Sequence, residues 1–163
     1  MRKMRPAFEV LLSRQGRIDR KESVAMPYFD NIEDLYWCLQ ELFDRLSDDP
    51  DIKKKALASK LIVNFVYDDP EGEVWIDCTG DEIVLTPGKA DLTADATLTM
   101  DSDVAHKFWL GKLNLIKALT SGDIESEGSV PKLLKLLPVI KPAFKIYPEI
   151  LTEKGLESII DVG

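Results

Sequence analysis

Few side chains in this 163-residue sequence could take part in acid–base or nucleophilic chemistry. His106 is the only histidine, so a catalytic triad or a Cys–His pair would have to use it. The sequence around His106 contains no nucleophile motif, and its amphipathic helical pattern is typical of a structural histidine. The sequence therefore predicts no catalytic residue and indicates a protein that is not an enzyme.

The cysteines and carboxylates do not indicate a metal site. Cys38 and Cys78 are too few for a disulfide framework and lack the spacing of zinc ligands. Asp101 and Asp103 resemble the start of a calcium loop, but the glycine and the terminal glutamate of an EF-hand are missing. We therefore expect buried cysteines, helix capping by residues 101–103, and neither metal nor cofactor.

Large apolar side chains form the more informative set. Together they offer more apolar surface than the short helices predicted around them need to pack on a core. They are Phe108, Trp109, Leu113, Ile116, Leu119, Leu133, Leu136, Leu137, Ile140 and Phe144. Burial of each contributes about 1.5–3 kcal/mol, so leaving several exposed would be costly. Two interpretations remain open: ordinary core packing, which periodicity alone favours, or the wall of an apolar tunnel.

The elements that would position these side chains follow from periodicity. Apolar residues at three- and four-residue steps predict a helix over 32–46, capped by Asp30 or Asn31, and a shorter one over 52–60. Alternating or β-branched runs predict strands, and short apolar stretches with capping residues predict further helices. The strands are expected at 61–67, 73–78, 82–86, 95–100 and 121–128, and the short helices at 104–110 and 115–119. The first three strands are joined by short turns and should form an antiparallel meander.

The segment that follows the last strand is apolar nearly all round, with lysines spaced between. Pro138 and Pro142 each remove a backbone donor, so a helix here should kink or break. The lysines at 132, 135, 141 and 145 could reach anionic headgroups while their stems lie along an apolar face. The alternative is a bent helix that wraps a sheet.

Composition and charge exclude several classes of protein. A net charge of −8 argues against a nucleic-acid binder, since phosphate contacts need clustered Lys and Arg. No run of about 18 apolar residues predicts a membrane span, and no secretory signal is expected, so cytoplasm is the expected location. We expect an N-terminal arm at 1–30, one domain at 31–148 and a tail at 149–163. The basic arm is expected to be a solvated tail, with contact to anionic lipid as the alternative.

Three stretches resemble the sterol carrier protein-2 (SCP2) sterol-binding domain. They are Ala-Asp-Ala-Thr-Leu-Thr-Met at 94–100, Gly-Lys-Leu-Asn at 111–114 followed by Lys117 and Ala118, and Ser-Gly-Asp-Ile at 121–124 leading to Glu127 and Gly128. Leu115 stands where the family usually has proline, and Asp123 where lysine is common. The resemblance implies an α+β fold, with a five-stranded, mainly antiparallel sheet covered by helices.

The resemblance also implies a function without catalysis. It favours the tunnel interpretation for the ten apolar residues, with a sterol, fatty acyl or isoprenoid lipid held between sheet and helices. The C-terminal segment would lie near the entrance, and transient contact with a membrane surface would accompany lipid transfer. The alternative is an accessory subunit that presents a lipid intermediate to enzymes of a lipid pathway.

Overall fold

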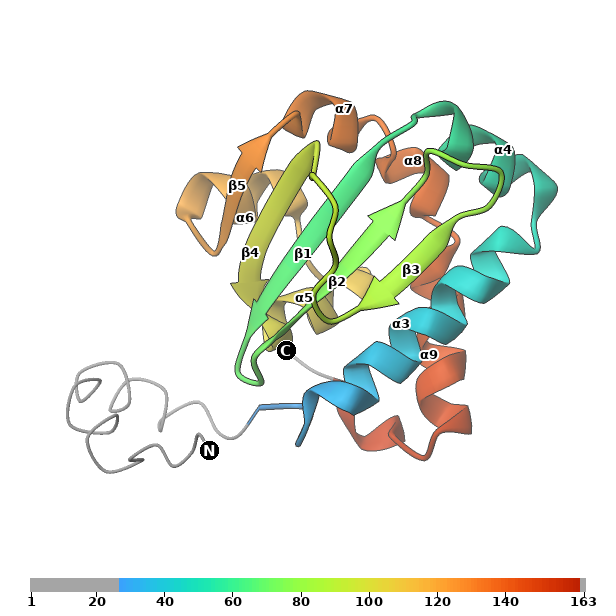
Figure 1. Cartoon of the computed structure of the whole chain (residues 1–163). Helices are drawn as coiled ribbons and strands as arrows, with labels where there is room; N and C mark the ends of the chain where they lie inside the picture. The colour runs from blue at the N-terminus through green and yellow to red at the C-terminus, as the bar shows by residue number, and fades with distance from the viewer. Residues whose placement is uncertain (1–26, 162–163) are drawn as a thin grey trace.

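The computed structural model describes residues 27–161 as a sheet with helices on one face (Figure 1). The strand order is β3-β2-β1-β4-β5. The strands are β1 (Ile62–Asp68), β2 (Gly72–Asp77), β3 (Val84–Pro87), β4 (Ala96–Asp101) and β5 (Ile124–Gly128). Three of the four pairings are antiparallel, and β1 with β4 is parallel. The predicted α+β fold with a mainly antiparallel sheet is confirmed.

Strand alternation divides the sheet into an inner and an outer face. Val63 of β1 lies beside Ala96 of β4, and both side chains are buried toward the helices. On the outer face Thr97 of β4 lies beside Glu127 of β5, which is exposed. This face has no helix over it, and the connection from β3 to β4 crosses it (Figure 1).

The helices form a layer on the inner face of the sheet (Figure 1). They are α3 (Ile32–Ser47), α4 (Pro50–Ala58), α5 (Ser102–Trp109), α6 (Leu115–Ser121), α7 (Val130–Leu134), α8 (Leu137–Ile140), α9 (Ala143–Glu153) and the 3-10 turn η2 (Glu157–Ile159). The Asn31 side chain caps α3 by accepting from the Asp34 N–H, and Asn114 caps α6 by accepting from Lys117. α3 packs against α9 across the helix layer.

Two helices begin earlier than their patterns predict. α4 starts at Pro50 because Asp49 accepts from the backbone of Asp51 and Ile52, and proline suits a first helical turn. α5 starts at Ser102, whose hydroxyl donates to the Pro70 carbonyl. Asp101 occupies the N-cap position, as expected, but its side chain makes no capping hydrogen bond.

The C-terminal segment is broken as predicted. Pro138 lies at the start of α8, and Pro142 precedes α9, so three helices replace one. α9 runs through Pro148 to Glu153, because Ile150 and Leu151 are fully buried. The expected boundary between domain and tail therefore falls inside a helix.

The expected N-terminal arm is described only from residue 27 onward, and residues 1–26 lie outside the described part. Phe29 is 2% exposed and belongs to the core. The Tyr28 backbone N–H donates to Asp103 Oδ1 at 2.9 Å. Residues 27–30 are thus packed on the domain.

Candidate functional site

A pocket lies between the inner face of the sheet and the helix layer, with a cavity volume of about 80 Å³. Its sheet wall consists of Leu61, Val63, Phe65, Tyr67, Ile76, Cys78, Ile83, Leu98, Met100 and Ile124. Its helical wall consists of Phe43, Leu46, Ile52, Ala56, Ala105, Phe108, Trp109, Leu115, Leu133, Leu136, Leu137, Val139 and Ile140. All are aliphatic, aromatic or sulfur-containing side chains, and none carries a charge at neutral pH. Such a wall suits an apolar ligand and offers no partner to an ion.

Six of the ten residues predicted to contact a lipid line this pocket. They are Phe108, Trp109, Leu133, Leu136, Leu137 and Ile140. Four are not among the lining residues. Leu113 and Leu119 are half-buried against the core, Ile116 is 53% exposed, and Phe144 packs edge-on against Phe108 with ring centres 5.9 Å apart. The lipid-binding role of all ten stays a prediction.

The residue set read from the sequence omitted the sheet wall. Val63 and Phe65 of β1 alternate toward the pocket, as do Leu98 and Met100 of β4. The period-two pattern carried this signal, because it places every second side chain on one face. Ala56 of α4 was also missed, and a single small residue in a weakly amphipathic helix gives no comparable signal.

Trp109 belongs to both the pocket wall and the core. Its ring lies edge-on to Phe43 with centres 5.6 Å apart, and to Phe108 with centres 4.8 Å apart. Phe65 approaches from the sheet at 6.5 Å, and Trp109 is only 2% exposed. Edge-to-face contacts of this kind add to the stabilisation from buried area. At Trp109 the two interpretations of the apolar residues, core packing and the wall of a tunnel, are therefore compatible.

The polar atoms at the pocket wall are uncharged. Burial raises the pKa of the Cys78 thiol to about 11, so the thiol stays protonated near neutral pH. Burial also raises the pKa of Tyr67 above its usual range. Within residues 27–161 the Tyr67 Oη atom has no hydrogen-bond partner. The wall is therefore neutral, with the Tyr67 hydroxyl as a polar group left without a partner among the described residues.

His106 lies in the core and does not line the pocket. Its Nε2 atom is 2.6 Å from the Ile159 carbonyl, which only accepts, so Nε2 carries the proton. Its Nδ1 atom then accepts from the Tyr147 hydroxyl at 2.9 Å. Burial lowers the pKa of His106 to about 4, because the charged form is excluded from the core. This neutral ring connects α5 to α9 and η2.

The cysteines are both buried, as predicted. Burial raises the pKa of Cys38 to about 12, with an opposing effect of nearby Lys154. No group of three or more His, Cys, Asp or Glu residues within the described chain could hold a metal ion. Among these same residues, none of the helices has the length and apolarity of a membrane span.

Solved structures resemble this fold. A sterol carrier protein domain 2 of Helicoverpa armigera has a TM-score of 0.54 and 22% identity, covering 65% of this chain and 84% of that one. Sterol carrier protein 2 from Yarrowia lipolytica, in its apo form, has a TM-score of 0.53 and 20% identity, covering 63% and 87%. The UbiJ-SCP2 ubiquinone synthesis protein has a TM-score of 0.52 and 16% identity, covering 64% and 87%.

Comparison with curated protein sequences finds no match. The model of the SCP-2 sterol transfer family matches residues 39–141. That range includes every strand, α4–α8 and most of α3, and hence the pocket described above. The chain therefore belongs to the SCP-2 sterol transfer family, whose domain implies lipid binding or transfer.

Proposed function

We propose that this protein carries a single apolar lipid in the pocket between sheet and helices, without chemical change to the lipid. The observation that supports the proposal is the uninterrupted apolar wall, to which all five strands except β3 contribute. Transfer of a lipid tail from water to such a wall is favourable by about 25 cal/mol per Å² of apolar area. Binding would then rest mainly on the apolar area buried and on the shape of the pocket.

The size of the pocket adds a requirement for movement. Its volume of about 80 Å³ is below the roughly 300–1,000 Å³ of typical ligand pockets. A lipid tail therefore needs part of the wall to move outward. α7 and α8 contain no buried residue, whereas six residues of α3 are buried, so displacement of α7 and α8 disrupts the fewest contacts. We infer that these two short helices form the lid of the pocket.

The proposal is tested by filling the pocket from α4. Ala56 lines the pocket, and Ala58 on the same helix is exposed. Ala56→Leu should lower the affinity for a fluorescent fatty acid or sterol about tenfold, because the added carbons occupy space the tail needs. Ala58→Leu adds the same carbons outside the pocket and should leave the affinity unchanged. Equal affinities for both variants would place the lipid elsewhere, and no uptake by the parent protein would refute lipid carriage.

A second candidate function is an accessory subunit that presents a lipid intermediate to enzymes. The supporting observation is the outer sheet face, which lacks a helix and carries exposed acidic side chains such as Glu125 and Glu127. The name of one structural neighbour, a ubiquinone synthesis protein, is consistent with such a role. Glu125→Lys together with Glu127→Lys should then abolish capture of the partner enzymes and spare lipid uptake. If the protein is only a carrier, the two substitutions should change neither its lipid uptake nor its set of bound proteins.

A further inference from the structure

One residue in the wall of the pocket carries a polar group that the fold leaves unsatisfied. Tyr67 of β1 lines the pocket, and its side chain is buried with 1% exposed. Within residues 27–161 its Oη atom has no hydrogen-bond partner. Asn64 Oδ1 is in the same condition among these residues, but Asn64 does not line the pocket. A buried hydroxyl that has lost its hydrogen bonds to water destabilises the fold, so the one at the pocket wall requires an explanation.

Two other tyrosine hydroxyls packed in the same layers show what the fold does elsewhere. The Tyr147 hydroxyl donates to His106 Nδ1 at 2.9 Å. The Tyr36 hydroxyl accepts from the backbone N–H of Glu73 at 3.1 Å. Neither of these tyrosines lines the pocket. The hydroxyl without a partner therefore belongs to the tyrosine that a bound lipid would touch.

The chemistry of the wall restricts what could satisfy Tyr67. Burial raises the pKa of Tyr67 above its usual range, so the hydroxyl keeps its proton and can donate it in a hydrogen bond. No lining residue carries a charge at neutral pH, so a carboxylate or phosphate at this position would be buried without a counter-ion. The group that fits is an uncharged oxygen, such as a hydroxyl or the carbonyl of a ketone or ester.

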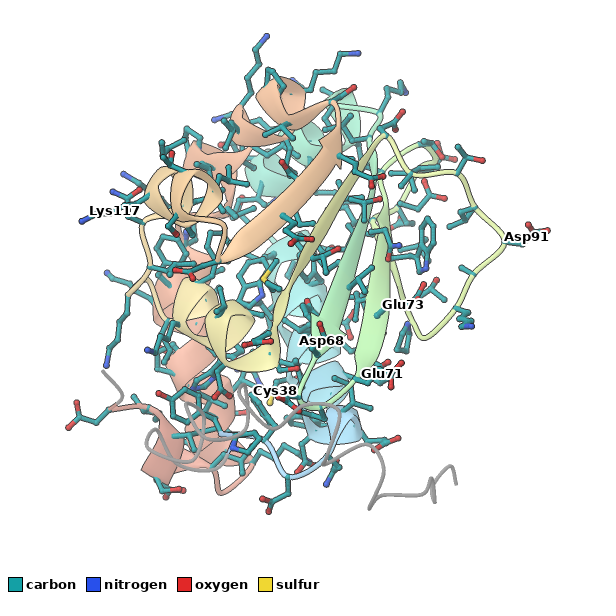
Figure 2. All side chains as sticks on the ribbon, turned by 90° about the vertical axis from the view of Figure 1, so that its left-hand side faces the viewer. Cys38, Asp68, Glu71, Glu73, Asp91 and Lys117 are labelled. Atoms are coloured by element: carbon teal, nitrogen blue, oxygen red, sulfur yellow. The ribbon has the colours of Figure 1, made fainter. Side chains whose placement is uncertain are left out.

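Tyr67 lies at the end of β1 that is remote from the inferred lid. The start of β1 is joined to the start of α7 through Asp95, which accepts from the Ile62 N–H at its side chain and from the Ser129 N–H at its carbonyl. Tyr67 lies near the opposite end of the strand. The next residue, Asp68, lies toward the lower end of the strands, and the orange α7 lies at the top (Figure 2). A lipid that enters beneath the lid therefore reaches Tyr67 with the end that goes in first.

We propose that Tyr67 Oη donates a hydrogen bond to an uncharged oxygen at the inner end of the bound lipid, so that lipids with a terminal hydroxyl or carbonyl group enter oxygen first. The inference rests on the proposed function, because the lipid occupies the same pocket. Buried apolar area supplies most of the affinity, and Tyr67 decides the orientation and the class of lipid. An ionised fatty acid keeps its charged head in water, enters tail first and does not use Tyr67.

The test removes one oxygen from the protein and one from the ligand. Tyr67→Phe deletes Oη and keeps the ring, and Tyr147→Phe is the matched control, because its hydroxyl lies outside the pocket wall. Affinities for dodecanol, dodecane and ionised dodecanoate are measured with the full chain by displacement of bound N-phenylnaphthylamine at neutral pH. Tyr67→Phe should weaken the binding of dodecanol about fivefold and leave the other two affinities unchanged. Tyr147→Phe should change none of the three.

Thermal melting of the lipid-free protein gives a second readout. Tyr67→Phe should not lower the melting temperature, because the hydroxyl that it removes has no partner, whereas Tyr147→Phe should lower it. A lower melting temperature for Tyr67→Phe would assign its hydroxyl a structural partner and overturn the inference.

The binding results separate this inference from the function on which it rests. If Tyr67→Phe binds dodecanol as tightly as the parent does, the oxygen contact is refuted and lipid carriage stands. Equal weakening of all three ligands would show that Tyr67 acts through the shape of the pocket, and would also overturn the inference. Failure of the parent protein to bind any of the three would refute the proposed function, and the inference with it.

Discussion

At the scale of single residues, the side chains that could do chemistry are held in structural contacts. His106 is fully buried, donates from Nε2 to Ile159 and accepts at Nδ1 from Tyr147. Phe29 packs edge-on to the imidazole with ring centres 5.2 Å apart. The sequence predicted a structural histidine from the absence of a neighbouring nucleophile. It could not predict these partners, because they lie 41 and 53 positions away.

The buried imidazole predicts a pH dependence of stability. The pKa of His106 is about 4 in the folded state, below the roughly 6.5 of an unfolded histidine, so the unfolded chain binds more protons between these values. Stability should therefore fall as the pH drops from 6.5 toward 4, by about 3 kcal/mol from this group. Urea unfolding at a series of pH values measures the slope. The His106→Gln variant keeps every carboxylate of the parent, so the two proteins differ only in the contribution of the histidine. Stability of the variant should therefore change less steeply with pH, and an identical dependence would contradict a buried, neutral His106.

Backbone geometry at one glycine gives a second prediction at this scale. Gly128 ends β5 with φ of +88°, and a Cβ there would collide with the Asp95 carbonyl. Gly122 has φ of +89° but open space around it. Gly128→Ala should therefore lower the free energy of unfolding by about 1–3 kcal/mol more than Gly122→Ala does. At Gly122 only the left-handed backbone conformation opposes the new side chain. Chemical denaturation of both variants measures the difference, and equal losses would show that the strand end can shift freely.

At the scale of elements, the sequence predicted the types of element better than their partners. The prolines at 138 and 142 predicted the breaks between α7, α8 and α9, because a missing N–H acts locally. The same rule fails at Pro148, where buried Ile150 and Leu151 keep α9 continuous. The parallel pairing of β1 with β4 has no local signal either, because alternation is the same for both strand directions.

The two lid helices predict a hierarchy of local opening. α7 and α8 contribute no buried residue, whereas α9 buries Tyr147, Ile150 and Leu151. Amide exchange is fast where few buried contacts must be broken, so the amides of α7 and α8 should exchange well before those of α9 and β1. Hydrogen–deuterium exchange with mass spectrometry measures the order. Addition of a fatty acid should change the amide exchange rates of α7 and α8 and leave those of α3 unchanged. A uniform change over all helices would argue against a lid.

At the scale of the whole molecule, the candidate site could be predicted only in part. The apolar stretches at 108–119 and 133–144 were visible in the sequence, and they supply much of the helical wall. Which side chains face the pocket depends on how the helices rotate over the sheet, and this separates Leu115 from Ile116. Long-range packing therefore decides what local patterns leave open.

The extent of the folding unit is the last property of this scale, and buried residues outside 31–148 predict a longer unit. The shorter range lacks Phe29, Ile150 and Leu151, which are nearly or fully buried. Loss of one buried Phe side chain alone costs about 3–5 kcal/mol, a large part of the stability of an ordinary domain. A chain of 31–148 should therefore lack the cooperative melting transition of the full protein. Chains of 31–163 and 1–148 each lack one end, so they measure how much stability each end contributes. Cooperative melting of 31–148 near the parent temperature would show that the packed ends are dispensable, and that the boundaries predicted from the sequence are the functional ones.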